Sequence, residues 1–292
     1  MVNMFDAIFR KLIVPAETKI AMLILDGLGG LPLEPGGKTE LETAKTPNLD
    51  ALAARSALGL SVPVGPGVAA GSGPGHLAIF GYDPIEYEIG RGALEALGVD
   101  FELGPDDIAA RGNFCTVDET GILTDRRAGR LPSEASLELI HLLRGIRIEG
   151  AEFFVEPVKE HRFAWIMRAR GLGAALTDTD PQTTGVKPPE VRALDERSLR
   201  AADLANRFIQ RAGELLAGRT PANWILLRGF AKHPKLPTME EVFGLKPAAL
   251  AVYPMYRGLA KLVGMEALPC GTTLPEQIQA LRANFDKYDF FF

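Results

Sequence analysis

The feature that most constrains the fold is an apolar run near the start of the chain that stops abruptly at an acid. Residues 20–25 read Ile-Ala-Met-Leu-Ile-Leu and predict a buried strand, and Asp26-Gly27 follows directly. A carboxylate at the end of a buried strand is costly to leave unpaired, so such a residue usually meets a cation. An Asp-Gly pair is equally typical of a turn. The run therefore predicts a strand that ends in a cation ligand or in a simple turn.

A serine among glycines, Ser72, lies further along the chain in the sequence Ala-Gly-Ser-Gly-Pro-Gly-His. The apolar stretch 77–80 follows, so Ser72 can begin a helix, where free backbone N–H groups stabilise an alkoxide or a phosphate. Taken alone, these glycines are also typical of a flexible turn. Asp26 and Ser72 in this order together favour a metal-activated nucleophile that handles phosphate.

Composition excludes several classes of protein. The 292 residues are 47% hydrophobic and 24% charged, which predicts a packed core rather than disorder. The net charge of −5 and the lack of a dense Lys/Arg stripe argue against nucleic-acid binding. No apolar run is long enough for a membrane span, and residues 5–14 predict a short packing helix rather than a signal peptide. Cys115 and Cys270 lie far apart without metal-type spacing. We therefore expect a cytoplasmic enzyme.

The first third of the chain alternates strand and helix signals. Thr46 and Pro47 predict the N-cap and first residue of a helix, and residues 44–58 are rich in alanine and leucine, as in a helix that packs on a sheet. A strand followed by a helix in this rhythm favours an α/β fold with a mainly parallel sheet flanked by helices.

The pattern changes near residue 100 to that of an α+β domain. The expected strands are 107–117, 122–123, 151–155, 163–167 and 224–227, and the expected helices are 134–143, with Ser133 as its N-cap, and 199–216. After a proline-rich linker at 233–237, a strand at 248–252, a helix at 255–263 and a strand at 288–292 resume the first rhythm. We therefore expect residues 1–99 and 241–292 to form one domain, with residues 100–240 inserted into it.

Several motifs occur in a fixed order along the chain. They are Ile24-Leu25-Asp26-Gly27-Leu28-Gly29, Thr46-Pro47-Asn48-Leu49-Asp50, Gly71-Ser72-Gly73-Pro74-Gly75-His76, Phe80-Gly81-Tyr82-Asp83-Pro84, Gly90-Arg91-Gly92, Arg111-Gly112-Asn113-Phe114, Asp125-Arg126-Arg127-Ala128-Gly129-Arg130 and Thr177-Asp178-Thr179-Asp180-Pro181. From about residue 19 to residue 292 the chain resembles the archaeal-type cofactor-independent (2,3-bisphosphoglycerate-independent) phosphoglycerate mutases of the alkaline phosphatase superfamily. The resemblance implies an alkaline-phosphatase-like metal-binding domain interrupted by a substrate-binding domain.

The resemblance also implies roles for single residues. In that family the aspartate at the position of Asp26 binds metal, and the serine at Ser72 binds metal and accepts the phosphoryl group. Such an enzyme interconverts 3-phosphoglycerate and 2-phosphoglycerate in glycolysis and gluconeogenesis through a phosphoserine. The family uses two divalent ions, commonly Mn²⁺ or Mg²⁺, with Zn²⁺ and Co²⁺ as alternatives, and no organic cofactor. A bound metal lowers the pKa of the serine hydroxyl and so yields a nucleophile near neutral pH.

The other metal ligands of the family are missing from this sequence. Relatives complete the site with a later Asp and His, an adjacent Asp-His pair and a further His. None of the histidines here, His76, His141, His161 and His233, lies in such a motif. The sequence stops at Asp289-Phe290-Phe291-Phe292, within a predicted buried strand. We therefore expect a truncated, inactive chain with half a metal site; an exposed apolar end is also compatible with a homo-oligomer.

Substrate binding must neutralise a phosphate and a carboxylate, for which arginine is well suited. The candidates are Arg126 and Arg130 before a helix, His161 and Arg162 between two predicted strands, and Arg228 at the end of strand 224–227. A solvated turn would equally explain the first pair, and a structural role would explain a lone histidine. Asp178 and Asp180 are expected to orient arginines or the hydroxyl of a sugar acid, or else to cap a turn. We expect His76 to pack near Ser72 rather than to bind metal.

Two other functions stay open at this point. The first is a metal-dependent phosphatase or phosphotransferase that acts on another small phosphorylated metabolite. The second is a non-catalytic, truncated homologue that binds phosphorylated metabolites or a partner. A mutase must protect its phosphoserine from water, whereas a phosphatase releases phosphate. Isomer formation measured against phosphate release therefore separates the two enzymes.

Overall fold

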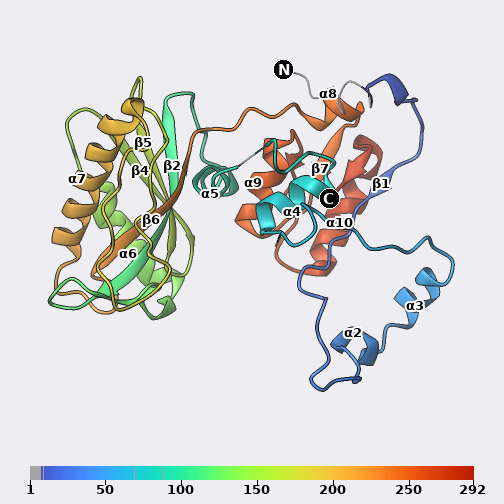
Figure 1. Cartoon of the computed structure of the whole chain (residues 1–292). Helices are drawn as coiled ribbons and strands as arrows, with labels where there is room; N and C mark the ends of the chain where they lie inside the picture. Colours follow the sequence, from blue (N-terminus) through green and yellow to red (C-terminus); the bar gives the residue numbers. More distant parts are fainter. Residues whose placement is uncertain (1–7, 9, 69, 88) are drawn as a thin grey trace.

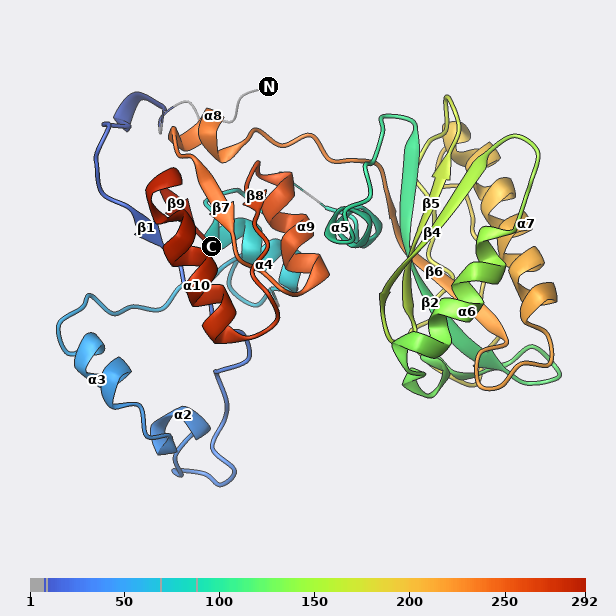
Figure 2. The ribbon, with the colours of Figure 1, turned by 180° about the vertical axis from the view of Figure 1, so that it is seen from behind.

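The computed structural model describes residues 8, 10–68, 70–87 and 89–292. The helix expected over residues 5–14 falls in part outside these residues. Two sheets lie side by side, and helix α5 (Arg91–Gly98) lies between them (Figures 1 and 2). Within the described residues, no helix has both the length and the apolar character needed to cross a membrane.

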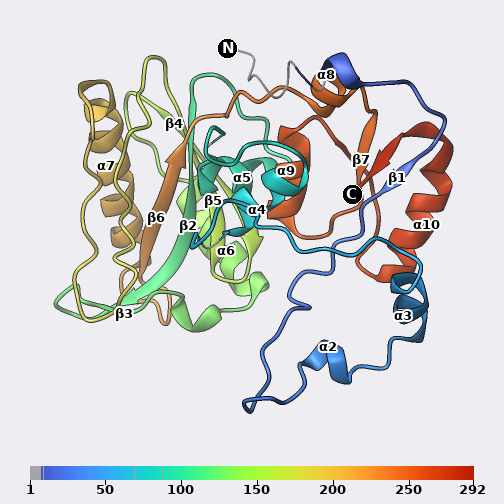
Figure 3. The ribbon, with the colours of Figure 1, turned by 45° about the vertical axis from the view of Figure 1, so that its right-hand side comes forward.

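The first sheet is parallel, with strand order β1-β9-β7-β8. Its strands are β1 (Ile20–Ala21), β7 (Pro247–Ala249), β8 (Glu266–Ala267) and β9 (Phe290–Phe291). Its helices are α4 (Ser72–Ile79), α8 (Met239–Phe243), α9 (Pro254–Leu262) and α10 (Leu274–Asn284). Leu77, Leu259 and Phe290 share one apolar cluster, whereas Leu281 of α10 packs near Phe291 in another. Accordingly, α9 and α10 lie on opposite sides of β7 (Figure 3).

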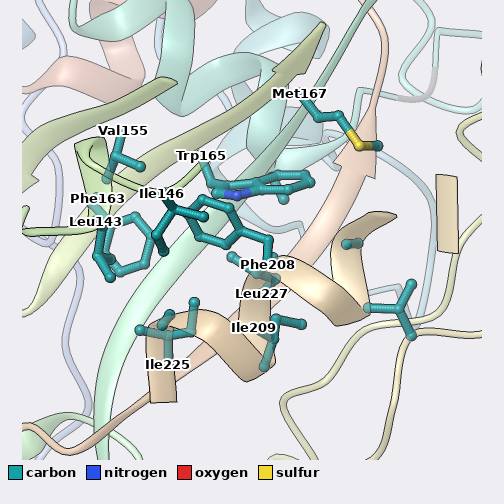
Figure 4. Close-up of a cluster of buried hydrophobic side chains, with 14 of the residues drawn as sticks. Leu143, Ile146, Val155, Phe163, Trp165, Met167, Phe208, Ile209, Ile225 and Leu227 are labelled. Carbon is teal, nitrogen blue, oxygen red and sulfur yellow. The ribbon is translucent and has the colours of Figure 1, made fainter. Parts of the chain in front are cut away.

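The second sheet is antiparallel, and its long strand β2 lies at the centre. Its strands are β2 (Asp107–Val117), β3 (Leu123–Asp125), β4 (Glu152–Lys159), β5 (Arg162–Arg168) and β6 (Trp224–Ala231). Helices α6 (Ser133–Arg144) and α7 (Leu199–Leu216) cover one face. There Trp165 of β5 meets Phe208 of α7 with ring centres 5.6 Å apart (Figure 4).

Helix α5 covers the other face of the antiparallel sheet and reaches the parallel-sheet half as well. Ala96 of α5 packs with Ala109 and Ile166 of the sheet. Glycines allow these close approaches: a Cβ at Gly92 would lie 2.2 Å from the Ala109 carbonyl oxygen, and one at Gly98 would lie 1.9 Å from that of Pro254. Helix α5 therefore packs tightly against both halves.

Several sequence-based expectations were wrong. The strand expected over 20–25 is shorter in the structure, where β1 covers Ile20 and Ala21, which pair with Phe290 and Phe291 of β9. Asp26 consequently lies in a turn, outside any strand. The helix expected over 44–58 is confined to α3 (Pro47–Ala53), and no residue of it is buried, so it does not pack on the sheet. A further short helix, α2, spans Glu40–Thr43.

Two local expectations in the antiparallel half also need correction. Pro132, not Ser133, is the N-cap of α6, and Ser133 is its first helical residue, with a side chain that accepts a hydrogen bond from Glu160 N. Arg228 does not end its strand, because β6 continues to Ala231 and pairs Arg228 with Arg111 of β2. Arg228 therefore lies in the middle of strand β6.

Candidate active site

A polar pocket of about 280 Å³ opens beside the antiparallel sheet and the start of α5. Its described lining combines arginines from several elements with a single carboxylate, that of Glu160. The lining residues are Arg91, Arg111, Asn113, Arg126, Arg127, Arg130, Glu160, His161, Arg162 and Arg228. We call this the arginine pocket. So many guanidinium groups in one cavity give it a strong local preference for anions.

The structure brings all the candidate substrate residues together in the arginine pocket. Arg126, Arg130, His161, Arg162 and Arg228 all line it. Sequence reasoning gave no role to Arg91, Arg111 or Asn113. Arg111 and Asn113 are two residues apart on β2 and therefore share a face of the sheet. Polar residues at this spacing within an apolar strand were a usable signal, and it was missed.

Strand register explains why these side chains meet. Arg111 lies opposite Arg228 of β6, and Asn113 lies opposite Arg162 of β5. Directly opposed residues in an antiparallel pair have side chains about 5 Å apart. Like charges at this spacing repel each other, so the cluster needs buried acids or an anionic ligand to offset the repulsion.

Asp180 is one of these acids. Its buried carboxylate accepts hydrogen bonds from Arg126 Nε and Nη2, both at 2.8 Å, and from Arg228 Nη1 at 3.2 Å. Burial alone would raise the pKa of Asp180, but the hydrogen bond from Arg126 and the nearby charges hold it below its usual value. Asp178 accepts a hydrogen bond from the backbone N–H of Gly229, the residue after Arg228, at 2.7 Å. Asp180 thus orients two guanidinium groups, and it also caps a turn by accepting a hydrogen bond from Gln182 N at 3.0 Å, so it has two of the roles expected for it.

Glu95 of α5 is the second buried acid. Its carboxylate lies 3.3 Å from Arg111 Nε, and the residue is 3% exposed. Burial raises the pKa of Glu95 in spite of the nearby guanidinium groups of Arg111 and Arg162. This ion pair ties α5 to β2 beneath the arginine pocket.

Many polar atoms of the arginine pocket lack a hydrogen-bond partner. Among the described residues, most of the buried side-chain nitrogen and oxygen atoms without one belong to this pocket: Arg111 Nε, Asn113 Oδ1, His161 Nδ1, Arg162 Nε and Arg228 Nε. Buried polar groups are usually satisfied, so a cluster of unsatisfied ones indicates a site for a ligand or ordered water. Burial and the charge of Arg162 lower the pKa of His161 to about 4, so its imidazole is neutral at pH 7.

Ser72 lies in a neighbouring pocket of about 380 Å³. It is exposed and is the first residue of α4, with Gly71 as the N-cap. This second pocket, which we call the serine pocket, shares Arg91, Arg111 and Arg162 with the arginine pocket. The same three guanidinium groups therefore border both the nucleophile candidate and the anion site.

Asp26 and Ser72 meet at a single phenol. The hydroxyl of Tyr256 donates a hydrogen bond to Asp26 Oδ2 and also interacts with the Ser72 side chain. Burial and the bond to Asp26 raise the pKa of Tyr256 to about 12. His76 stacks on the Tyr256 ring at 4.5 Å, and its Nδ1 donates to the Ser72 carbonyl oxygen at 2.7 Å. His76 thus packs beside Ser72, in line with the expectation.

A divalent metal fits this place in ligand type but not in ligand number. A carboxylate and a hydroxyl are hard oxygen donors of the kind that Mg²⁺ and Mn²⁺ prefer. However, no group of three or more His, Cys, Asp or Glu side chains that could hold a metal occurs in the described part of the chain.

Together the fold and the two pockets define an α/β protein in which an arginine-lined pocket adjoins an exposed serine at the start of a helix. A family model described as 2,3-bisphosphoglycerate-independent phosphoglycerate mutase matches residues 53–223. The chain belongs to the family of 2,3-bisphosphoglycerate-independent phosphoglycerate mutases.

Relatives and solved structures agree with this assignment. A probable 2,3-bisphosphoglycerate-independent phosphoglycerate mutase of Thermus thermophilus is 52% identical over 290 residues, which cover 98% of this chain and 71% of that protein. One from Aquifex aeolicus is 47% identical over 295 residues, covering 98% and 72%. The cofactor-independent phosphoglycerate mutase of Thermoplasma acidophilum superposes with a TM-score of 0.67 at 30% identity, covering 94% of this chain and 76% of that one. A protein of Pyrococcus horikoshii superposes with a TM-score of 0.75 at 27% identity, and the match covers 94% of this chain and 69% of that one.

Proposed function

We propose that the protein interconverts 3-phosphoglycerate and 2-phosphoglycerate by passing the phosphoryl group through Ser72. The observation that carries this proposal is the pair of adjoining pockets, which share Arg91, Arg111 and Arg162. A substrate with a phosphate and a carboxylate needs several guanidinium groups, and its phosphate must reach a nucleophile. The family assignment agrees with this substrate.

In this proposal the arginine pocket binds and orients the substrate. Arg126, Arg130, Arg162 and Arg228 neutralise its anionic groups, while Asp180 holds two of these arginines in place. The neutral imidazole of His161 adds a hydrogen-bonding group without adding charge. Residues 100–240 would then act as the substrate-binding domain, inserted between the two metal-binding parts 1–99 and 241–292.

The covalent step takes place at Ser72. Its Oγ attacks phosphorus, the bond from phosphorus to the substrate oxygen breaks, and that oxygen takes up the proton that Ser72 released, so that phosphoserine and glycerate result. Glycerate then turns within the arginine pocket. Its neighbouring hydroxyl gives up its proton and attacks phosphorus, the bond from phosphorus to Ser72 Oγ breaks, and Oγ takes up that proton. The hydroxyl proton of Ser72 must leave before attack, and the Asp26 carboxylate is the nearby acceptor, linked to Ser72 through Tyr256.

The resemblance to metal-dependent mutases adds a cofactor to the proposal. Asp26 and Ser72 would hold a divalent cation, Mn²⁺ or Mg²⁺, with Zn²⁺ or Co²⁺ as alternatives. When bound, such a cation lowers the pKa of the serine hydroxyl and offsets phosphate charge. We place the enzyme in the cytoplasm, which the composition and the free cysteines, Cys115 and Cys270, support.

The test is an assay of the full-length protein with 3-phosphoglycerate and Mn²⁺, followed by phosphorus NMR. We expect 2-phosphoglycerate to form much faster than inorganic phosphate. Ser72→Ala should lower the isomerisation rate by about 1,000-fold or more, because it removes the covalent route. Ser56→Ala, at an exposed serine that bonds only its own helix end, is the matched control and should retain full activity.

Other outcomes would favour the alternatives. Phosphate release without isomer would indicate a phosphatase, and the mutase proposal would fail. Binding of phosphoglycerate without either reaction would indicate a non-catalytic homologue. Substantial isomerisation by Ser72→Ala would remove the phosphoserine route.

A further inference from the structure

Tyr253 lies where the serine pocket meets the arginine pocket, although no sequence motif pointed to it. It is the N-cap residue of α9, is half-buried, and lines the serine pocket together with Ser72. Its hydroxyl accepts a hydrogen bond from Arg162 Nη1. The Arg162 guanidinium carbon also lies 5.9 Å from the centre of the Tyr253 ring. The hydroxyl of Tyr253 therefore holds the guanidinium group beside its own ring.

Arg162 depends on this contact for its orientation. Its Nε is buried and has no hydrogen-bond partner. Tyr253 supplies the hydrogen bond that the described residues give to this side chain. A guanidinium group is a rigid planar fork, so holding one Nη fixes the direction of its remaining N–H groups. Those free N–H groups lie at the boundary that both pockets share.

The same helix start also contacts the nucleophile side. The rings of Tyr253 and Tyr256 lie 5.3 Å apart, and Tyr256 donates its hydrogen bond to Asp26. Tyr253 belongs to the parallel-sheet half, whereas Arg162 begins β5 of the antiparallel sheet. The first turn of α9 thus touches both the anion-binding guanidinium and the residues around Ser72.

We propose that Tyr253 is a positioning residue that aims the free edge of Arg162 at the anionic group of the ligand next to Ser72. This inference rests on the proposed function for the identity of the ligand. It adds a tyrosine that touches Arg162 rather than the reacting atoms. Because a pre-oriented guanidinium binds the anionic group equally well before and during transfer, losing the hydroxyl should weaken substrate binding and leave kcat nearly unchanged.

The test compares Tyr253→Phe with the wild-type full chain by titration calorimetry, using 3-phosphoglycerate and, separately, inorganic phosphate. The substitution keeps the ring and removes the hydroxyl. We expect binding to weaken about tenfold, the usual size for a lost hydrogen bond to a charged group. In the activity assay the KM for 3-phosphoglycerate should rise by about the same factor, while kcat changes less than about twofold.

Two further variants make the result specific. Tyr288→Phe removes another tyrosine hydroxyl, which donates to Glu266 Oε2 at 2.6 Å within the parallel sheet, and should bind like wild type. Arg162→Lys shortens the donor while keeping the charge. If Tyr253 acts through Arg162, the double variant should bind no more weakly than Arg162→Lys alone.

The outcomes separate this inference from the proposed function. Unchanged binding by Tyr253→Phe would overturn the inference, and so would independent, additive losses in the double variant. A wild-type chain that binds phosphate but not phosphoglycerate would overturn the proposed substrate, while the phosphate titrations of the variants would still decide the role of Tyr253.

Discussion

His161 shows how one side chain in the arginine pocket responds to its neighbours. It is 5% exposed and lies 3.8 Å from the Glu160 carboxylate, but burial and the charge of Arg162 prevail and lower its pKa to about 4. In the unfolded chain a histidine titrates near pH 6.5. A neutral imidazole among guanidinium groups avoids one more like charge in a pocket that already has many.

This shift predicts a pH-dependent stability. Below about pH 6.5 His161 binds a proton in the unfolded chain but stays neutral in the folded protein, and this favours unfolding. The contribution of neutral His161 to the free energy of unfolding is therefore complete above pH 6.5 and is lost as the pH falls toward 4. Replacing His161 by Gln should therefore reduce the loss of unfolding free energy between pH 7 and pH 5 by roughly 1–2 kcal/mol. Urea unfolding of both proteins at the two pH values measures this.

His141→Gln is the matched control, because His141 is an exposed histidine of α6. It should leave the difference between pH 7 and pH 5 as in wild type. If the free energy of unfolding changed with pH in the same way for wild type and His161→Gln, His161 would bind a proton equally well in the folded and unfolded protein, and the prediction would be wrong.

At the scale of secondary-structure elements, helix α5 packs between the two sheets. It begins at Arg91, which lines both pockets, and it buries Glu95 against Arg111. Glycines on both α5 and α9 make the close packing possible: a Cβ at Gly258 of α9 would lie 2.3 Å from the Leu94 carbonyl oxygen. Both pockets therefore depend on how closely one short helix can approach its neighbours.

Gly92→Ala tests this packing. Helix propensity alone would favour alanine by about 1 kcal/mol. The new Cβ would lie 2.2 Å from a backbone oxygen of β2, however, and neither backbone can move cheaply. We expect a net destabilisation of about 1–3 kcal/mol, the usual range for overpacking, measured by urea unfolding.

Gly59→Ala provides the control, because a Cβ there meets nothing within 4 Å. Its effect should stay within about 0.5 kcal/mol, as for most surface substitutions. If Gly92→Ala were as stable as this control, α5 would have room to move away from β2, and the close packing would not be needed.

For the molecule as a whole, local and net charge have opposite signs. The chain carries a net charge of −5, yet the lining of its arginine pocket contains many guanidinium groups and one carboxylate, that of Glu160. An anionic ligand is therefore attracted by a local field rather than by the whole protein, and its binding should weaken as salt screens that field.

We expect 3-phosphoglycerate to stabilise the folded protein. At a ligand concentration about 100 times the Kd, the stabilisation should be about 2.7 kcal/mol, seen as a rise in Tm. The rise should shrink in high salt, and glycerol, which has no charge, should produce none. An equal rise with glycerol would mean that the arginine pocket does not drive binding.

Some elements could be predicted closely from the sequence. The strand expected over 107–117 and the helix expected over 199–216 are confirmed as β2 and α7, because both carry long, regular apolar patterns. The strand expected over 20–25 was too long, because hydrophobicity alone does not show how far strand pairing extends. The helix expected over 44–58 was wrong because a favourable composition does not supply a sheet for the helix to pack on.

The sequence by itself determined the chemistry that this protein can use: a serine among glycines, an acid after an apolar run, and arginines near predicted strands. Only the tertiary structure decided which of these groups meet. Arg111 faces Arg228 because of strand register. Tyr253 reaches Arg162 because glycines let α5 and α9 pack closely against each other. Such contacts join residues far apart in the chain, and their distances follow from pairing and packing rather than from any local pattern.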